Sequence, residues 1–229
     1  MTRLGVSRFG GLAGTVIWLA ATLLAGCAMG KAAAEVKRLQ AQAAYERGLK
    51  DLEEGRTALG LSALQEAAAL DSDRALYHND LGVLYLNLKR LPEAFQELKR
   101  AVDLDGTYGE ALHNLGVAYA EEGKWEEAVR LYKKALSVPA YGNSDGAYHN
   151  LGWAYYNLNR LQEAEETFRL VLKLQPNMAS AHYLMGLVLL KMERRDEAKV
   201  EFRRAKELAP DTPFGLAAQQ HLKALGEGG

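Results

Sequence analysis

Residues 113–119 of the chain read HNLGVAY, and related stretches occur three more times. These are HNDLGVLY at 78–85, HNLGWAY at 149–155 and HYLMGLVL at 182–189. Each stretch contains one glycine, and Gly48 extends the glycine series toward the amino terminus. The spacings between the five glycines are 34, 34, 36 and 34 residues. A period this regular predicts an architecture of stacked repeats.

A second motif keeps the same period. An alanine follows each of the last four glycines by twelve residues, and a bulky apolar residue comes four positions later. The alanines are Ala94, Ala128, Ala164 and Ala198, and the bulky residues are Leu98, Tyr132, Phe168 and Phe202. Each period also divides into two stretches of helical length with apolar residues at i, i+3, i+4 and i+7. The small glycines and alanines would let the two helices of a pair approach closely. Together with the helical periodicity, they predict an all-α chain of helix pairs.

These motifs resemble those of the tetratricopeptide repeat. The resemblance implies a right-handed superhelical solenoid with a concave groove, because one helix pair cannot bury its own apolar face. We expect about five repeats and a capping helix: repeats at 41–74, 75–108, 109–142, 145–178 and 179–212, and the cap and tail at 213–229. Asp51 and Gly60 depart from the pattern, so the first repeat is interpreted as an amino-terminal cap. The turn-rich segment 139–147 carries a two-residue insertion and predicts a bulged loop.

The amino terminus contains the only cysteine, Cys27, within LLAGCAMG at 23–30. A basic start at Arg3 and Arg8 and an apolar run over 9–25 are typical of a secretory signal peptide. The run is shorter than the ~20 residues of a membrane-spanning helix, which makes a permanent transmembrane anchor the weaker alternative.

The stretch from Leu24 to Cys27, LAGC, resembles the lipobox of bacterial lipoproteins. The resemblance implies cleavage between Gly26 and Cys27, removal of residues 1–26, and a lipid on the Cys27 thiol. Residues 27–40 would then form a short lipidated tether and the start of the first helix. Alanine at position 28 favours the outer membrane in that family, with the body of the protein facing the periplasm.

Composition and motifs argue against several other functions. A formal net charge of −1 gives no basic field to attract nucleic acid. The paired glutamates of the helices are expected to form a solvated face, and no catalytic constellation stands out. His113 and His149 occupy equivalent repeat positions, and helices about 8–10 Å apart would hold them too far apart to share zinc easily. We therefore expect no enzymatic activity, no metal and no cofactor besides the lipid on Cys27.

The tetratricopeptide resemblance also implies a partner-binding groove. It would include Asn79, Val83, His113, Val117, His149, Trp153, Tyr156, Tyr183 and Leu187. The lysine and asparagine of the family's carboxylate clamp are missing there, so the groove is expected to suit an amphipathic helix or an extended apolar segment. Two alternatives stay open: the histidines could bond to a neighbouring helix, and Trp153 and Tyr156 could pack against the inserted loop.

The combination of lipobox and repeats resembles the type IV pilus biogenesis lipoproteins of the PilF/PilW/Tgl kind. The resemblance includes the loop before YHNLGWAYY (148–156) and the ending FRRAKELAPDTPFGLAAQQHL (202–222). It implies a pilotin: a monomeric, lipid-anchored protein that helps a secretin subunit reach the outer membrane and form its ring. The alternative is a general periplasmic adaptor lipoprotein that docks peptidoglycan hydrolases, proteases or envelope assembly factors.

Overall fold

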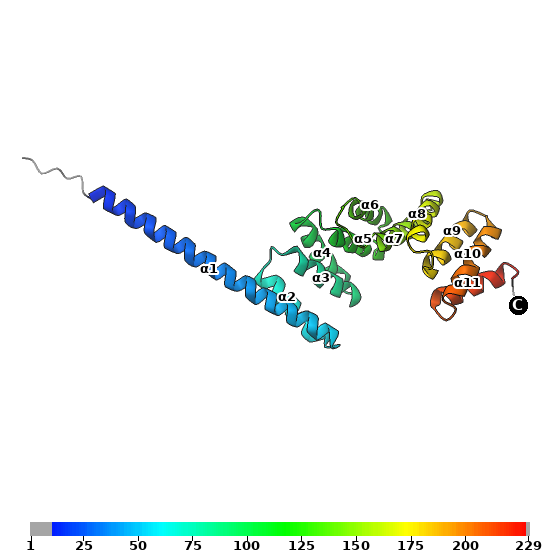
Figure 1. Ribbon diagram of the computed structural model, residues 1–229, viewed down its shortest axis with the longest axis horizontal. Coiled ribbons are helices and arrows are strands. Elements are labelled where there is room, and N and C mark those ends of the chain that lie inside the picture. The colour runs from blue at the N-terminus through cyan, green and yellow to red at the C-terminus, as the bar shows by residue number, and fades with distance from the viewer. Residues whose placement is uncertain (1–10, 228–229) are drawn as a thin grey trace, which may run out of the picture. The chain divides into compact units, whose positions relative to one another are not determined.

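The computed structural model describes residues 11–227, with side chains described from Gly30 onward. These residues form eleven α-helices and no strand (Figure 1), which confirms the all-α prediction. The chain divides into two compact units at the boundary between Asp73 and Arg74. This boundary lies within one residue of the predicted start of the second repeat at 75.

The first unit is a helix pair, α1 (Gly11–Glu53) and α2 (Thr57–Leu70). Residues 27–40, predicted as a tether and helix start, lie wholly within α1. Its described residues before Ala41 are exposed, and packing begins at Ala41, where the first repeat was predicted to begin. A Cβ on Gly60 would lie 2.6 Å from the Leu52 side chain, so the unusual glycine of this repeat permits a close helix crossing.

The membrane-related predictions concern the start of α1. The side chain of Cys27 and the cleavage site at Gly26 lie outside the residues whose side chains are described. Among the described residues, no helix is both long enough and apolar enough to cross a membrane.

The second unit contains four helix pairs and a final single helix. They are α3 (Ala75–Asn87) with α4 (Leu91–Leu104), α5 (Gly109–Glu121) with α6 (Trp125–Leu136), α7 (Ser144–Asn157) with α8 (Leu161–Leu174), α9 (Ala179–Lys191) with α10 (Arg195–Leu208), and α11 (Pro213–Ala224). Each pair falls within one predicted repeat to within a residue, and α11 is the predicted cap. The second unit is therefore a tetratricopeptide-type solenoid.

The glycine of each repeat packs against the bulky residue of its own second helix. A Cβ on Gly116 would lie 2.7 Å from Tyr132, and one on Gly152 would lie 2.9 Å from Phe168. Real Cβ atoms do not approach this closely, so the glycines set the distance between the two helices. The alanines of the second motif, at 94, 128, 164 and 198, are fully buried beside them.

The turns inside the five helix pairs share one unusual backbone conformation. The residue at the fifteenth repeat position has a positive φ each time: Gly55, Lys89, Gly123, Asn159 and Glu193. Positive φ is strained for residues other than glycine, yet lysine and glutamate adopt it here. The packing of the two helices therefore fixes the turn, and the first repeat follows the same geometry despite its divergent sequence.

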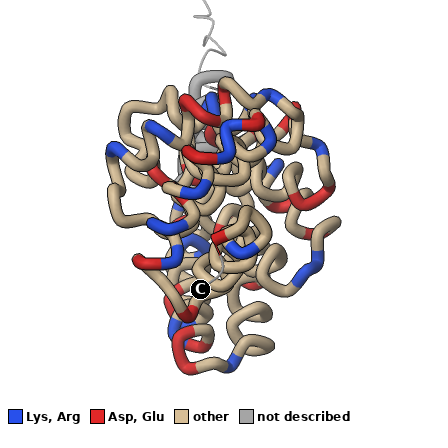
Figure 2. Tube along the Cα trace, turned by 90° about the vertical axis from the view of Figure 1, so that its right-hand side faces the viewer, with Lys and Arg blue, Asp and Glu red and all other residues tan. Residues whose placement is uncertain are grey.

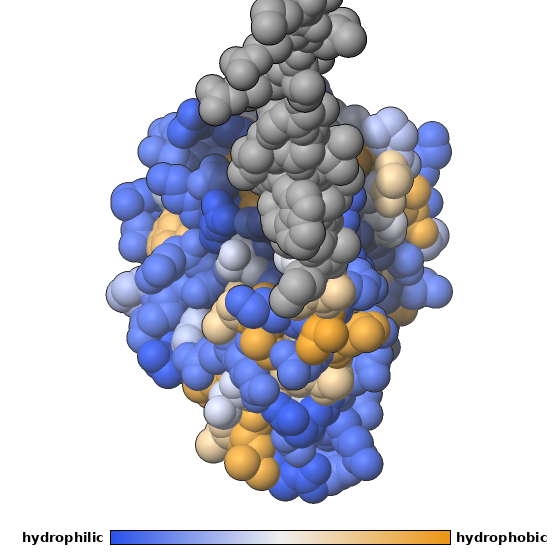
Figure 3. All heavy atoms as spheres, turned by 90° about the vertical axis from the view of Figure 1, so that its left-hand side faces the viewer, coloured by the Kyte–Doolittle hydropathy of each residue, from blue (hydrophilic) through white to orange (hydrophobic). Residues whose placement is uncertain are grey.

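Two connections complete the second unit. The loop between α6 and α7 folds inward, and Tyr141 is buried in a small core with Leu112 and Ala147. At the other end, the Thr212 side chain caps α11 by accepting a hydrogen bond from the Gly215 backbone nitrogen at 3.3 Å. Lys and Arg are interspersed with Asp and Glu over the described trace (Figure 2), and hydrophilic side chains surround the apolar patches on the face in Figure 3.

Candidate protein-binding surface

Helix α7 carries an aromatic stack that a lysine of α9 contacts. The Trp153 and Tyr156 rings lie 5.1 Å apart between centroids, with only 12° between their planes. The Lys191 ammonium of α9 lies 4.7 Å from the Tyr156 ring centroid, a favourable cation–π distance. Trp153 and Tyr156, three residues apart, therefore share one side of α7. Because both side chains are only partly buried, they are available to a partner.

A hollow of about 310 Å³ lies beside this stack, between α5, α6 and α7. Its lining consists of Val117, Ala120, Glu121, Trp125, Tyr132, Asn150 and Trp153. Trp125 was not among the predicted groove residues. It begins α6, where the matching residues of the second and fourth repeats are Leu91 and Leu161. Tryptophan at a position that holds leucine in those two repeats is the signal in the sequence that could have identified Trp125.

Two predicted groove residues, Asn79 and His113, are not exposed in a groove. They are buried, with 4% and 8% of their surface exposed. Each accepts a hydrogen bond from the asparagine of the next repeat: Asn114 Nδ2 is 2.9 Å from Asn79 Oδ1, and Asn150 Nδ2 is 2.8 Å from His113 Nε2. These side chains tie neighbouring first helices together, as the alternative interpretation of the histidines had allowed.

His113 makes a second hydrogen bond, to the inserted loop. The Tyr141 hydroxyl oxygen lies 2.7 Å from His113 Nδ1. Because Nε2 accepts from Asn150, the neutral ring carries its proton on Nδ1 and donates it to Tyr141. Burial lowers the pKa of His113 to about 4, so the ring is neutral at physiological pH. The loop thus docks on His113 through Tyr141.

His149 stands at the equivalent position of the next repeat in a different environment. Its Nε2 atom is buried without a hydrogen-bond partner. The asparagine that would supply one is replaced in the fifth repeat by Leu184, which is also buried. Burial lowers the pKa of His149, and a hydrogen bond with Asn150 opposes this in part.

The remaining predicted residues differ in how accessible they are. Val83, Val117 and Leu187 are partly buried. Tyr183 packs on the capping helix: its ring centroid lies 5.8 Å from that of Phe214 and 5.9 Å from that of His221. Tyr183 therefore supports α11, which makes it a poor choice for testing the groove by mutation.

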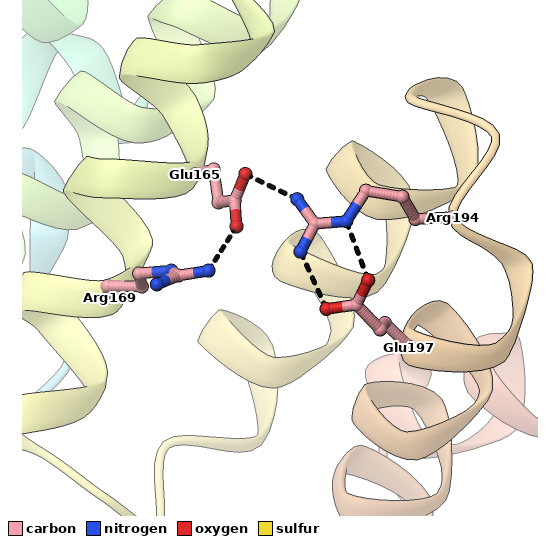
Figure 4. A network of polar contacts seen from close by, with 4 residues as sticks. All are labelled: Glu165, Arg169, Arg194 and Glu197. Carbon is pink, nitrogen blue, oxygen red and sulfur yellow. Dashed lines mark hydrogen bonds and ion pairs between the residues drawn. The ribbon is translucent and has the colours of Figure 1, made fainter.

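A polar network occupies a different part of the second unit, between α8 and α10 (Figure 4). Glu165 is 9% exposed and accepts from Arg169 at 2.5 Å and from Arg194 at 2.7 Å. Arg194 also donates to both carboxylate oxygens of Glu197. These contacts link the fourth and fifth repeats and balance the buried carboxylate of Glu165. Beside them lies a hollow of about 410 Å³ with Leu172 and Met185 in its lining.

No group of three or more histidine, cysteine, aspartate or glutamate residues is placed to hold a metal ion in the part of the chain that the structure describes.

Family models for the tetratricopeptide repeat match residues 72–140, 107–177 and 149–213. The chain belongs to the tetratricopeptide-repeat family. Tetratricopeptide repeats bind protein partners, and this chain is accordingly a protein–protein interaction scaffold. Scaffolds of this fold are generally non-enzymatic.

Curated relatives match about half of the chain. Human protein O-mannosyl-transferase TMTC2 is 32% identical over 43% of this chain and 12% of its own length. The small glutamine-rich tetratricopeptide repeat-containing protein 2 of Saccharomyces cerevisiae is 30% identical over 47% of this chain and 29% of its own length. The chain thus spans less than a third of each of these two relatives, so the matches reflect the shared repeat.

Solved structures extend the similarity over most of the chain. Pseudomonas aeruginosa pilF has a TM-score of 0.67 and 22% identity, covering 84% of this chain and 95% of its own. A MamA crystal structure has a TM-score of 0.66, 23% identity and coverages of 75% and 92%. YrrB, described as a tetratricopeptide protein with an unusual peptide-binding site, has a TM-score of 0.64, 21% identity and coverages of 77% and 90%. At these identities the likeness establishes the fold.

Proposed function

We propose that this protein is a non-enzymatic, lipid-anchored pilotin, which binds a secretin subunit and assists secretin localisation and multimer assembly in the outer membrane. The observation that carries the proposal is the partly exposed Trp153–Tyr156 stack beside a hollow. Aromatic side chains in such positions tend to dominate the binding energy of interfaces.

Two further features support the pilotin role over other scaffold roles. The LAGC sequence ending at Cys27 matches a lipobox, and a lipid would hold the scaffold at a membrane. The fold of Pseudomonas aeruginosa pilF also covers 84% of the chain. The competing role, a general periplasmic adaptor, shares the anchor and the groove and differs only in its partner.

The anchor is tested with Cys27→Ser. The variant should stay unprocessed and should incorporate no labelled palmitate, because the serine hydroxyl does not replace the acylated thiol. Equal palmitate labelling of the variant and the wild type would refute the anchor.

The groove is tested with the double substitution Trp153→Ala and Tyr156→Ala. Losing an aromatic anchor typically costs about 2 kcal/mol, or roughly thirty-fold in affinity, so secretin capture and the heat-resistant secretin multimer should both decline. The matched control is Leu170→Ala with Leu174→Ala on α8, since these apolar side chains are 46% and 51% exposed. A well-folded groove variant that captures secretin at wild-type strength would exclude the groove.

The partner itself is tested by deleting the gene. Loss of secretin multimers is the expected outcome. If the multimers persist while peptidoglycan hydrolases or other envelope factors are released, the adaptor role replaces the pilotin role.

A further inference from the structure

The hollow between α5, α6 and α7 has an uncommon composition. The chain contains three tryptophans, and two of them, Trp125 and Trp153, line this one hollow. Tyr156 stacks on the Trp153 ring, and Trp153 also lines the hollow. Glu121 is the charged residue of the lining. Two indole rings and a carboxylate around a small space are the groups that bind an organic cation through cation–π and ionic contacts.

The turn that borders the hollow is strongly acidic. Residues 120–127 read AEEGKWEE, with four glutamates against the single Lys124. The equivalent turns differ: 86–93 carries Lys89 and Arg90 against one glutamate, and 156–163 carries one arginine against one glutamate. The acidic charge is therefore a property of this turn and is absent from those two repeats.

The lysines near the hollow leave the Glu121 carboxylate available to a ligand. The Lys124 ammonium lies 2.6 Å from Glu122. The Lys89 ammonium is 3.9 Å from Glu121, but their side chains are 79% and 53% exposed, and such exposed pairs contribute little stability. A cation from a partner could replace Lys89 at small cost.

From this geometry we infer that the hollow is an arginine-binding subsite, which takes the guanidinium of an arginine side chain from the partner protein. The inference rests on the protein-binding function proposed above and names the chemistry of the segment that is bound. The arginine stem would lie along Val117 and Ala120, and the guanidinium would lie against the tryptophans and pair with Glu121. Arginine suits such a site better than lysine, because its planar group stacks on aromatic rings and pairs with carboxylates in one geometry.

Isothermal titration of the full-length protein in detergent micelles tests the inference. The probe is a blocked heptapeptide with a central arginine flanked by leucine and alanine, and the comparison peptides replace arginine by citrulline or by norleucine. Citrulline keeps the shape and loses the charge, whereas norleucine keeps only the apolar stem. The arginine peptide should bind roughly tenfold more tightly than either one, as cation–π contacts predict.

Two variants assign the binding to the hollow. Trp125→Leu installs the residue found at this position in the second and fourth repeats, so it should keep the fold, and Glu121→Gln removes the charge with little change of shape. Each should weaken binding of the arginine peptide by roughly tenfold. The matched control, Glu166→Gln on the exposed face of α8, should bind as the wild type does.

Each alternative outcome would overturn the inference. Equal binding of the arginine and norleucine peptides would mean that the hollow takes an apolar side chain. Unchanged affinity in well-folded Trp125→Leu and Glu121→Gln variants would place the peptide elsewhere, and no binding at millimolar concentration would exclude the subsite. Because the assay contains no secretin, these results are independent of the test of the pilotin role.

Discussion

His113 and His149 are the same residue at the same repeat position, one repeat apart, yet their surroundings differ. His113 bonds to Tyr141 through Nδ1 and to Asn150 through Nε2. His149 has a buried Nε2 atom without a partner. The difference comes from the neighbours: the inserted loop supplies Tyr141, and Leu184 stands where the third and fourth repeats have asparagine.

This comparison teaches that the polar contacts between repeats depend on the next repeat along the chain. At the junction between α5 and α7, His113 bonds to Asn150 of α7 and to Tyr141 of the inserted loop, whereas at the junction between α7 and α9 the side chains of Leu184 and Val188 are buried in the core. The aromatic surface of α7 lies between these two junctions. Four predictions test the difference, and they are ordered by expected effect.

Removing the Tyr141 side chain should have the largest effect. Tyr141→Ala would empty a buried site and leave His113 Nδ1 unpaired, and truncating a buried aromatic typically costs about 3–5 kcal/mol. Urea unfolding monitored by circular dichroism would measure this loss of unfolding free energy. Tyr141→Phe keeps the ring and removes only the hydroxyl, so it should cost about 1–2 kcal/mol. A wild-type midpoint for Tyr141→Ala would mean that the loop does not stabilise this junction.

Acidification should destabilise the fold through the buried histidines. Because the pKa of folded His113 is lowered to about 4 and an unfolded histidine titrates near 6.5, the unfolded state binds protons first as the pH falls. Stability is therefore complete above pH 6.5 and is lost between 6.5 and 4, by up to about 3 kcal/mol for this residue.

The matched variant for the acid test is His113→Asn, because Asn79 fills the same position in the second repeat and bonds to Asn114. Melting curves at several pH values should show a shallower loss of stability in this variant than in the wild type. If the melting temperature falls equally steeply with decreasing pH in the variant and in the wild type, His113 is not the group that titrates.

The repeat glycines inside the third and fourth helix pairs should respond alike. Gly116→Leu would clash with Tyr132 and Gly152→Leu with Phe168, and overpacking of this kind typically costs about 1–3 kcal/mol. The melting temperatures of the two variants should fall by similar amounts. An unchanged melting temperature for either one would contradict the helix crossing described here.

Substituting leucine for each histidine should give the smallest effects on stability. These substitutions should also show the difference between the two junctions most clearly. His113→Leu leaves Asn150 and Tyr141 without their partner and should cost about 1–3 kcal/mol. His149→Leu removes a buried nitrogen that has no partner and should be neutral or slightly stabilising. Equal losses in parallel unfolding experiments would mean that the two histidines are equivalent after all.

The sequence by itself determined the repeat, the repeat boundaries and the packing within each helix pair. These features depend on residues less than one repeat apart, so the period of Gly116 and its equivalents and the bulky residue sixteen positions later were enough. The sequence also placed Trp153 and Tyr156 on one side of α7, since helical spacing alone decides that.

Only the tertiary structure decided which side chains meet between repeats. Asn79 and His113 were predicted to line a groove, but the neighbouring first helix lies close enough for an asparagine to cover each of them. Trp125 and Trp153, 28 residues apart in the chain, line one hollow, and Tyr141 bonds to His113 from a loop that the repeat pattern does not describe. Contacts of this kind depend on how far each helix pair is rotated relative to the next. That rotation follows from the packing of whole helices. No local spacing in the sequence specifies it.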